Sequence, residues 1–276
     1  MTESKTSLST EPAKIDVLTI GGVAVGVYFL CSFVHEAVGH AGTAALLGAQ
    51  VTKITTAYVT HQGASGSEAR LIAAAGIVAN LLVGGLAFLA RHKWQRCDND
   101  VAHYFLWLLG HMNLFTAGGY LMTFALMRVG DLNIVVRGLA YEMAIRITML
   151  LVGLVITAWT FVYAGRTLVE FAGHSGDRIR RGVAMTLTPY LVGGSANVGA
   201  SLLGIGEVPV AIVLMSAVGA TFGGMFPLVW VPLMMPKSSD HLRVRTPGRS
   251  ISWLIAGAVF LVLYLFLGHG ISFATA

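Results

Sequence analysis

The chain has 276 residues, of which 55% are hydrophobic and only 11% are charged, and its mean hydropathy is +0.74. A soluble domain carries about 25% charged residues, so the composition excludes an ordinary water-soluble globule and predicts that lipid surrounds much of the chain. The net charge of +5 comes from loops and does not indicate nucleic-acid binding. Cys31 and Cys97 provide neither a disulfide framework nor a cysteine-rich metal motif.

A polar tail, residues 1–16, precedes about seven apolar runs, each close to the length of about 20 residues that a membrane span needs. Because every backbone group in lipid must be paired within the protein, these runs are expected to be helices. The sequence therefore predicts an all-α, polytopic transmembrane helix bundle of six to seven spans, an integral membrane protein whose surroundings are the lipid bilayer. The runs are Val17–Leu47, Leu71–Ala90, His103–Met127, Ile147–Ala164, Val183–Leu203 (rich in glycine and interrupted by Pro189), Val208–Met235 and Ser252–Phe273.

Lysine and arginine are concentrated in the second, fourth and sixth connections between these runs. By the positive-inside rule, this asymmetry predicts a cytoplasmic N-terminus and, with seven spans, an outer C-terminus. The segment Thr60–Arg70 is expected to be a polar, flexible loop, and His174–Gly182 a basic cytoplasmic loop. No connection is long enough to form a soluble module.

Two histidines and a glutamate lie inside the first apolar run, in the segment His35-Glu36-Ala-Val-Gly-His40. A charge near the bilayer centre costs about 2.5–3.5 kcal/mol, and an adjacent dication would offset that cost for Glu36. In zinc sites of the H-E-x-x-H type, two histidines hold the metal, which acidifies a bound water, and the glutamate takes the proton of that water. The alternative is a packed or interfacial pair of histidines without metal.

The second histidine arrives one residue later than in H-E-x-x-H. In a regular α-helix, His35 and His40 would point about 140° apart around the axis. A π-bulge, with hydrogen bonds from i to i+5, returns them to one face, and Gly39 eases such a distortion. The sequence predicts a π-type bulge or wide turn around Ala37–Gly39.

A catalytic zinc usually has three protein ligands. Asp131 is the expected third ligand, because it is the only acidic residue between Asp100 and Glu142 and its connection lies on the same side of the membrane as the histidines. His61 is the alternative. His111 is disfavoured because it lies about 30 Å from Asp131 along a straight helix.

Three segments carry a resemblance to a known family: "FVHEAVGHAGTAALLGAQVTKI", "AAAGIVANLLVGG" and "NLFTAGGYLMTFALMRVGD". Together they resemble the core of the site-2 protease (M50-like) family of intramembrane zinc metallopeptidases. The resemblance implies a three-helix catalytic-type core in residues 17–132 and additional transmembrane helices in residues 133–276.

The resemblance also implies roles for individual residues. It makes His35, His40 and Asp131 the ligands of Zn²⁺, Glu36 the general base, and Asn80 a residue that holds substrate backbone or an oxyanion. The chain departs from the family in the extra residue of its H-E-x-x-G-H motif, although a similar motif serves zinc in the dipeptidyl-peptidase III family. Ile77 replaces a proline of the second segment, and the proline-containing motif before the aspartate is absent.

The sequence thus predicts a zinc metallopeptidase, a hydrolase that acts on a membrane protein or peptide within the bilayer. One alternative is a non-catalytic zinc-binding relative that acts as a membrane chaperone or binding protein. A metal or proton transporter with an intramembrane His/Glu relay is a third possibility, disfavoured because the halves of the chain show no repeat.

Overall fold

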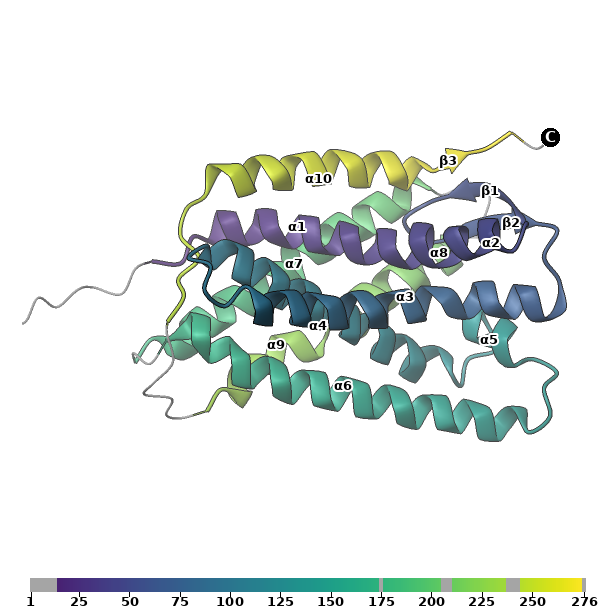
Figure 1. The fold of residues 1–276 in the computed structure, drawn as a ribbon, viewed down its shortest axis with the longest axis horizontal. Helices are drawn as coiled ribbons and strands as arrows, with labels where there is room; N and C mark the ends of the chain where they lie inside the picture. The colour runs from purple at the N-terminus through teal and green to yellow at the C-terminus, as the bar shows by residue number, and fades with distance from the viewer. Residues whose placement is uncertain (1–13, 174–175, 205–209, 237–243, 275–276) are drawn as a thin grey trace, which may run out of the picture.

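A computed structural model describes residues 14–173, 176–204, 210–236 and 244–274. The protein is mostly helical, and its long helices run side by side along one axis (Figure 1). The helices are α1 (Val17–Phe33), the π-helix η1 (Val34–Ala41), α2 (Gly42–Leu46), α3 (Gly66–Lys93), α4 (Asp100–Phe124), α5 (Gly130–Val136), α6 (Glu142–Ala172), α7 (Arg178–Leu203), α8 (Val210–Val218), the π-helix η2 (Gly219–Gly223), α9 (Pro227–Trp230), the 3₁₀-helix η3 (Val231–Met234) and α10 (Ile251–His269). The strands are β1 (Gln50–Ile54), β2 (Val59–Gln62) and β3 (Ile271–Ser272).

Four helical segments are long and apolar enough to cross a membrane. They are the continuous run from α1 to α2 over Val17–Leu46, and helices α3, α6 and α10. Helices α6 and α10 present apolar side chains outward, with Val155 67% and Val262 66% exposed. Large exposed apolar faces suit lipid and not water, so the structure is compatible with the expected membrane protein.

Helix α4 lies at the centre of the bundle, in contact with α1, α3 and α6. Its Tyr104, Trp107 and Phe115 side chains are completely buried. The Tyr104 hydroxyl donates to the carbonyl of Met185 on α7 at 2.6 Å, so its one polar atom is paired inside the core. The central position of α4 brings the segment after it, which carries Asp131, back against the end of α1.

The expectation of an all-α fold was incomplete, because a small antiparallel sheet with strand order β2-β1-β3 covers one end of the bundle. The expected flexible loop Thr60–Arg70 was also wrong: Thr60 lies in β2, and α3 begins at Gly66 after a capping box formed by Ser65 and Glu68. The sheet pairs Lys53 with Ser272, which lie far apart in the chain. A strand as short as β3 has too few residues for the sequence to predict it.

The later apolar runs also differ from their predicted form. Within Val208–Met235 the described residues form α8, η2, α9 and η3 instead of one regular helix, while residues 208–209 lie outside the described part. Helix α7, in contrast, is continuous through Pro189. It begins at Arg178, so the expected basic loop His174–Gly182 ends five residues earlier than predicted, and residues 174–175 are not described.

Close contact between α1 and α10 depends on two glycines. A Cβ at Gly257 would lie 2.5 Å from Cα and 2.8 Å from O of Gly22, both backbone atoms. We expect Gly257→Ala to destabilise the protein by about 1–3 kcal/mol, the usual effect of overpacking, measured by thermal unfolding in detergent. Gly199→Ala on α7 is the matched control, since a Cβ there meets no described atom within 4 Å. Equal stability of the two variants would contradict the assignment of this contact.

Candidate metal centre

The first described helix, α1, changes from α-helical to π-helical geometry at the histidines. Residues Val34–Ala41 form the π-helix η1 between α1 and α2, which confirms the predicted π-type distortion and extends it beyond Ala37–Gly39. Because π-helical hydrogen bonds run from i to i+5, His35 and His40 share one face. Their ring centroids are 4.8 Å apart, with the ring planes at 83°.

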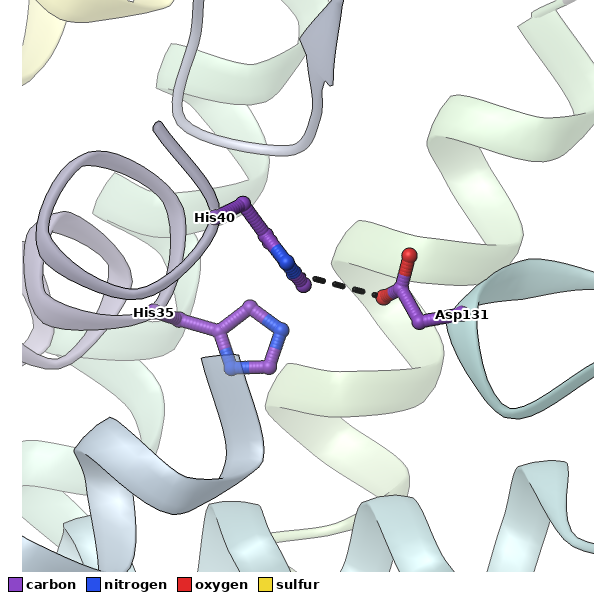
Figure 2. Close-up of side chains that lie close together, drawn as sticks. All are labelled: His35, His40 and Asp131. Atoms are coloured by element: carbon purple, nitrogen blue, oxygen red, sulfur yellow. Dashed lines mark ion pairs between the residues drawn. The ribbon is translucent and has the colours of Figure 1, made fainter. Parts of the chain in front are cut away.

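Asp131 reaches the same place from the opposite side, in the first turn of α5. Figure 2 shows the two histidines on one side and Asp131 facing them from the other. One ligand atom from each of His35, His40 and Asp131 lies within 4.8 Å of the other two, and His40 Nε2 is 3.4 Å from Asp131 Oδ2. The structure therefore brings together the three residues that the sequence suggested as metal ligands.

A chain of buried amides fixes the orientation of the His35 ring. Asn113 Nδ2 donates to the carbonyl of Leu109, which leaves Asn113 Oδ1 to accept a hydrogen bond from Asn80 Nδ2 at 2.7 Å. Asn80 Nδ2 also donates to the carbonyl of Cys31, so Asn80 Oδ1 must be the atom that faces His35 Nδ1, at 2.6 Å. His35 Nδ1 is therefore the protonated nitrogen, and Nε2 keeps its lone pair for a metal.

A backbone carbonyl orients the His40 ring so that its Nδ1, like that of His35, carries the proton. Its Nδ1 donates to the carbonyl of Ile72 at 2.7 Å. Its Nε2 is buried and has no hydrogen-bond partner within the described part of the chain. The charged group nearest to this nitrogen is the Asp131 carboxylate at 3.4 Å, and a buried imidazole nitrogen that faces a carboxylate has the surroundings of a metal ligand.

Gly76 on α3 forms the floor beneath the two rings. A Cβ at this position would lie 2.7 Å from His35 Nε2 and 2.7 Å from His40 Nε2. Gly39 faces the same backbone, since its own Cβ would lie 2.6 Å from Gly76 Cα. Because neither Gly39 nor Gly76 has a side chain, η1 and α3 can approach this closely. A side chain at position 76 would occupy the space beside His35 Nε2 and His40 Nε2, the two nitrogens available to a metal.

The Asp131 carboxylate is held by Tyr120 of α4, whose hydroxyl donates to Oδ2 at 2.7 Å. Burial would raise the pKa of Asp131, but the interaction with His40, together with smaller contributions from His35 and Tyr120, lowers that pKa to about 2. Asp131 is therefore ionised at neutral pH, as a metal ligand must be. Sequence reasoning missed Tyr120, because its role depends on how the chain turns between α4 and α5.

Glu36 lines a cavity of about 380 Å³ that also receives His35, His40 and Asp131. The Glu36 side chain is buried, yet none of the hydrogen bonds or ion pairs among the described residues involves its carboxylate. Most of the cavity wall is apolar, from residues such as Met112. A carboxylate without a partner in such a cavity is suited to accept a proton from a water beside the metal group.

The remaining candidates occupy different positions. Asn80 is 0% exposed and lies behind His35, with its amide fully engaged, so it supports the ring and does not face the cavity as the resemblance implied. His61 on β2 lines the cavity, and its buried Nδ1 has no partner among the described residues, but it is not part of the group of three. His111 lies apart from the cavity, where it donates to the carbonyl of Trp107 and contacts the Phe88 ring.

Comparison with known proteins adds no relative: no family model matches the chain, and no curated protein and no solved structure matches it either. Inferences about function therefore rest on the geometry of the site.

A methyl group at position 76 tests the floor of the site. If the group holds a metal such as zinc, we expect Gly76→Ala to weaken its binding at least about tenfold, the lower end of the effect of disturbing the surroundings of a metal ligand, because the added methyl group displaces both histidine rings. Zinc per protein by mass spectrometry after purification in detergent measures this. Gly85→Ala on the same helix is the control, since its Cβ meets no described atom within 4 Å. Wild-type zinc content in Gly76→Ala would exclude the proposed position of the metal.

Proposed function

We propose that the protein is a membrane-embedded, zinc-dependent metallopeptidase that hydrolyses a peptide bond of a membrane protein or membrane-bound peptide. The observation that carries this proposal is the convergence of His35, His40 and Asp131 beside the free carboxylate of Glu36, on one cavity among apolar helices. Two imidazoles and a carboxylate form a ligand set of the kind that catalytic zinc sites use, which leaves the fourth position for water.

In this proposal some residues bind the metal and another transfers a proton. His35 and His40 would hold zinc through their Nε2 atoms and Asp131 through a carboxylate oxygen. When bound, zinc supplies Lewis acidity for water and carbonyl groups. Glu36 would take a proton from the attacking water and later return it to the leaving amine nitrogen. The apolar wall of the cavity would accommodate the side chains of a lipid-embedded segment.

The proposed membrane arrangement has six to seven spans, with α4, α7 and the broken segment α8–η3 added to the four long apolar helices. Its N-terminus is cytoplasmic. In support, the last turn of α3, at the end of the bundle where α1 begins, carries Arg91 and Lys93. The metal group lies toward the other end, beyond α1, near the sheet (Figure 1).

A second candidate function is a non-catalytic zinc protein with a closed site, acting as a chaperone or binding protein. One observation favours it: the unpaired Nδ1 of His61 belongs to a side chain on the same cavity. A shift of β2 that brought this nitrogen to the metal would fill the position of the attacking water. A structural zinc of this kind would need no general base, so Glu36 separates the two candidates.

Metal content is the first test of the proposal. Wild-type protein purified in detergent is expected to hold about one zinc ion, the stoichiometry of a site with one set of three ligands, and the double variant His35→Ala/His40→Ala to lose it. The double variant His92→Ala/His269→Ala is the matched control, because both of those histidines are exposed. Equal zinc content in all three proteins would show that the metal site is assigned wrongly.

Catalysis is tested separately with Glu36→Gln, which keeps the shape of the side chain and removes its basicity. The variant should retain zinc and lose peptide hydrolysis by about 10²–10⁴-fold, the usual contribution of a general base. The assay is cleavage of a library of single-span peptides co-reconstituted in proteoliposomes, with products identified by mass spectrometry.

Glu68→Gln serves as the control in that assay, since glutamine also suits its place in a capping box. Hydrolysis by Glu36→Gln at the wild-type rate would exclude the mechanism. Zinc binding with no cleavage of any peptide by the wild type would favour the closed, non-catalytic site.

A further inference from the structure

A buried arginine lies near the metal group without touching it. Arg146 belongs to the first turns of α6 and is 2% exposed. Its guanidinium donates to the carbonyls of Ala125 at 2.8 Å and Met127 at 3.0 Å, and to Asn133 Oδ1 at 2.8 Å. Glu142 balances its charge at 2.9 Å. An arginine engaged in this way performs a specific structural task, because burying its charge is costly without partners.

The partners of Arg146 stand on both sides of Asp131 in the chain. Ala125 and Met127 directly follow the end of α4 at Phe124, whereas Asn133 lies in α5. The chain leaves helical geometry after Phe124, and Arg146 donates to two of the carbonyls that follow it, those of Ala125 and Met127. One planar group therefore ties the end of α4 to α5 and encloses the segment that carries Asp131.

Apart from the His40 ring, whose Nε2 lies 3.4 Å away, the one described contact of the Asp131 carboxylate is the hydroxyl of Tyr120. That contact restrains the side chain, while the Arg146 contacts restrain the backbone on either side of it. The two histidines, in contrast, belong to a continuous helical segment and need no such clamp. Asp131 is thus the ligand whose position depends most on a distant residue.

We propose that Arg146 is a positioning residue for the third metal ligand: its fork of donors holds the chain on both sides of Asp131, so that the carboxylate meets His35 and His40. This inference rests on the proposed metal site. Lysine would keep the positive charge, but a single ammonium group cannot reproduce the planar fork that spans the carbonyls and the amide. The geometry of the guanidinium, and not its charge, is then what metal affinity requires.

The experiment compares Arg146→Lys with Arg245→Lys in full-length protein in detergent, and measures zinc affinity by competition with a chromophoric chelator. Arg245 is a matched control, 5% exposed, whose guanidinium donates to the carbonyls of Cys97 and Gln95 at the other end of the bundle. We expect Arg146→Lys to weaken zinc binding about 10–100-fold, as outer supports of metal ligands do, and Arg245→Lys to leave it unchanged. Equal losses in the two variants would overturn the proposal, because they would report general destabilisation.

A double-mutant cycle adds a readout that loss of stability alone would not move. If Arg146 acts through Asp131, Arg146→Lys should weaken zinc binding in the wild type and have no further effect in Asp131→Asn. The visible spectrum of Co²⁺-loaded Arg146→Lys should likewise shift toward that of Co²⁺-loaded Asp131→Asn. Additive losses, or a wild-type cobalt spectrum in Arg146→Lys, would overturn the inference.

If Arg146→Lys fails to fold, a milder variant, Asn133→Ala, tests the same proposal. Asn133→Ala removes one of the three contacts that flank Asp131 and leaves the guanidinium in place, so a smaller loss of zinc affinity is expected, and unchanged affinity would overturn the proposal. The two levels of inference fail differently. Wild-type protein that binds no zinc refutes the metal site itself, whereas zinc-binding wild type with unaffected Arg146 and Asn133 variants refutes only the clamp.

Discussion

The π-helical winding of Val34–Ala41 against Gly76 is the constraint on which the candidate metal centre depends. A regular helix would send the two histidines in different directions, and a bulky residue at position 76 would fill the space beside their nitrogens. The longer turn places both rings over α3, and the small residues let the two backbones meet. The π-helical geometry therefore compensates for the extra residue in the H-E-x-x-G-H motif, and the His35 and His40 rings still face one another.

Polar groups in this part of the bundle form a directed chain. The amide of Asn113 orients that of Asn80, which in turn orients His35. Among apolar helices few alternative partners compete, so such an arrangement specifies one geometry. The consequence reaches the chemistry, because the tautomer of His35 follows from the direction of these bonds. An asparagine buried far behind the cavity, Asn113, thus helps to determine which histidine nitrogen is available.

The sequence anticipated much of the helical fold and the grouping of His35, His40 and Asp131, for physical reasons. Lipid leaves long apolar segments few alternatives to a helix, and a buried His-Glu pair is rare enough to mark a site. The sheet and the roles of Tyr120 and Arg146 could not be anticipated, because they depend on contacts between segments distant in the chain. The resemblance gave Asn80 a role toward substrate or an oxyanion, whereas its place behind His35 depends on a contact between residues 45 positions apart in the chain. The broken segment after Val210 does carry local signals, since α9 begins at Pro227 and Pro232 lies at the start of η3.

The choice between an open, hydrolytic site and a closed one depends on what the unpaired groups of the cavity require. Glu36 is buried in a mostly apolar cavity without a partner among the described residues, a costly arrangement that a purely structural zinc site would not need. The unpaired Nδ1 of His61 could bind the metal only if β2 moved. However, β2 is paired with β1 at four positions. The strand pairing therefore restrains the closed alternative, whereas the free carboxylate has an immediate use in the open one. On this balance the hydrolytic interpretation explains one more feature of the cavity than the structural interpretation does.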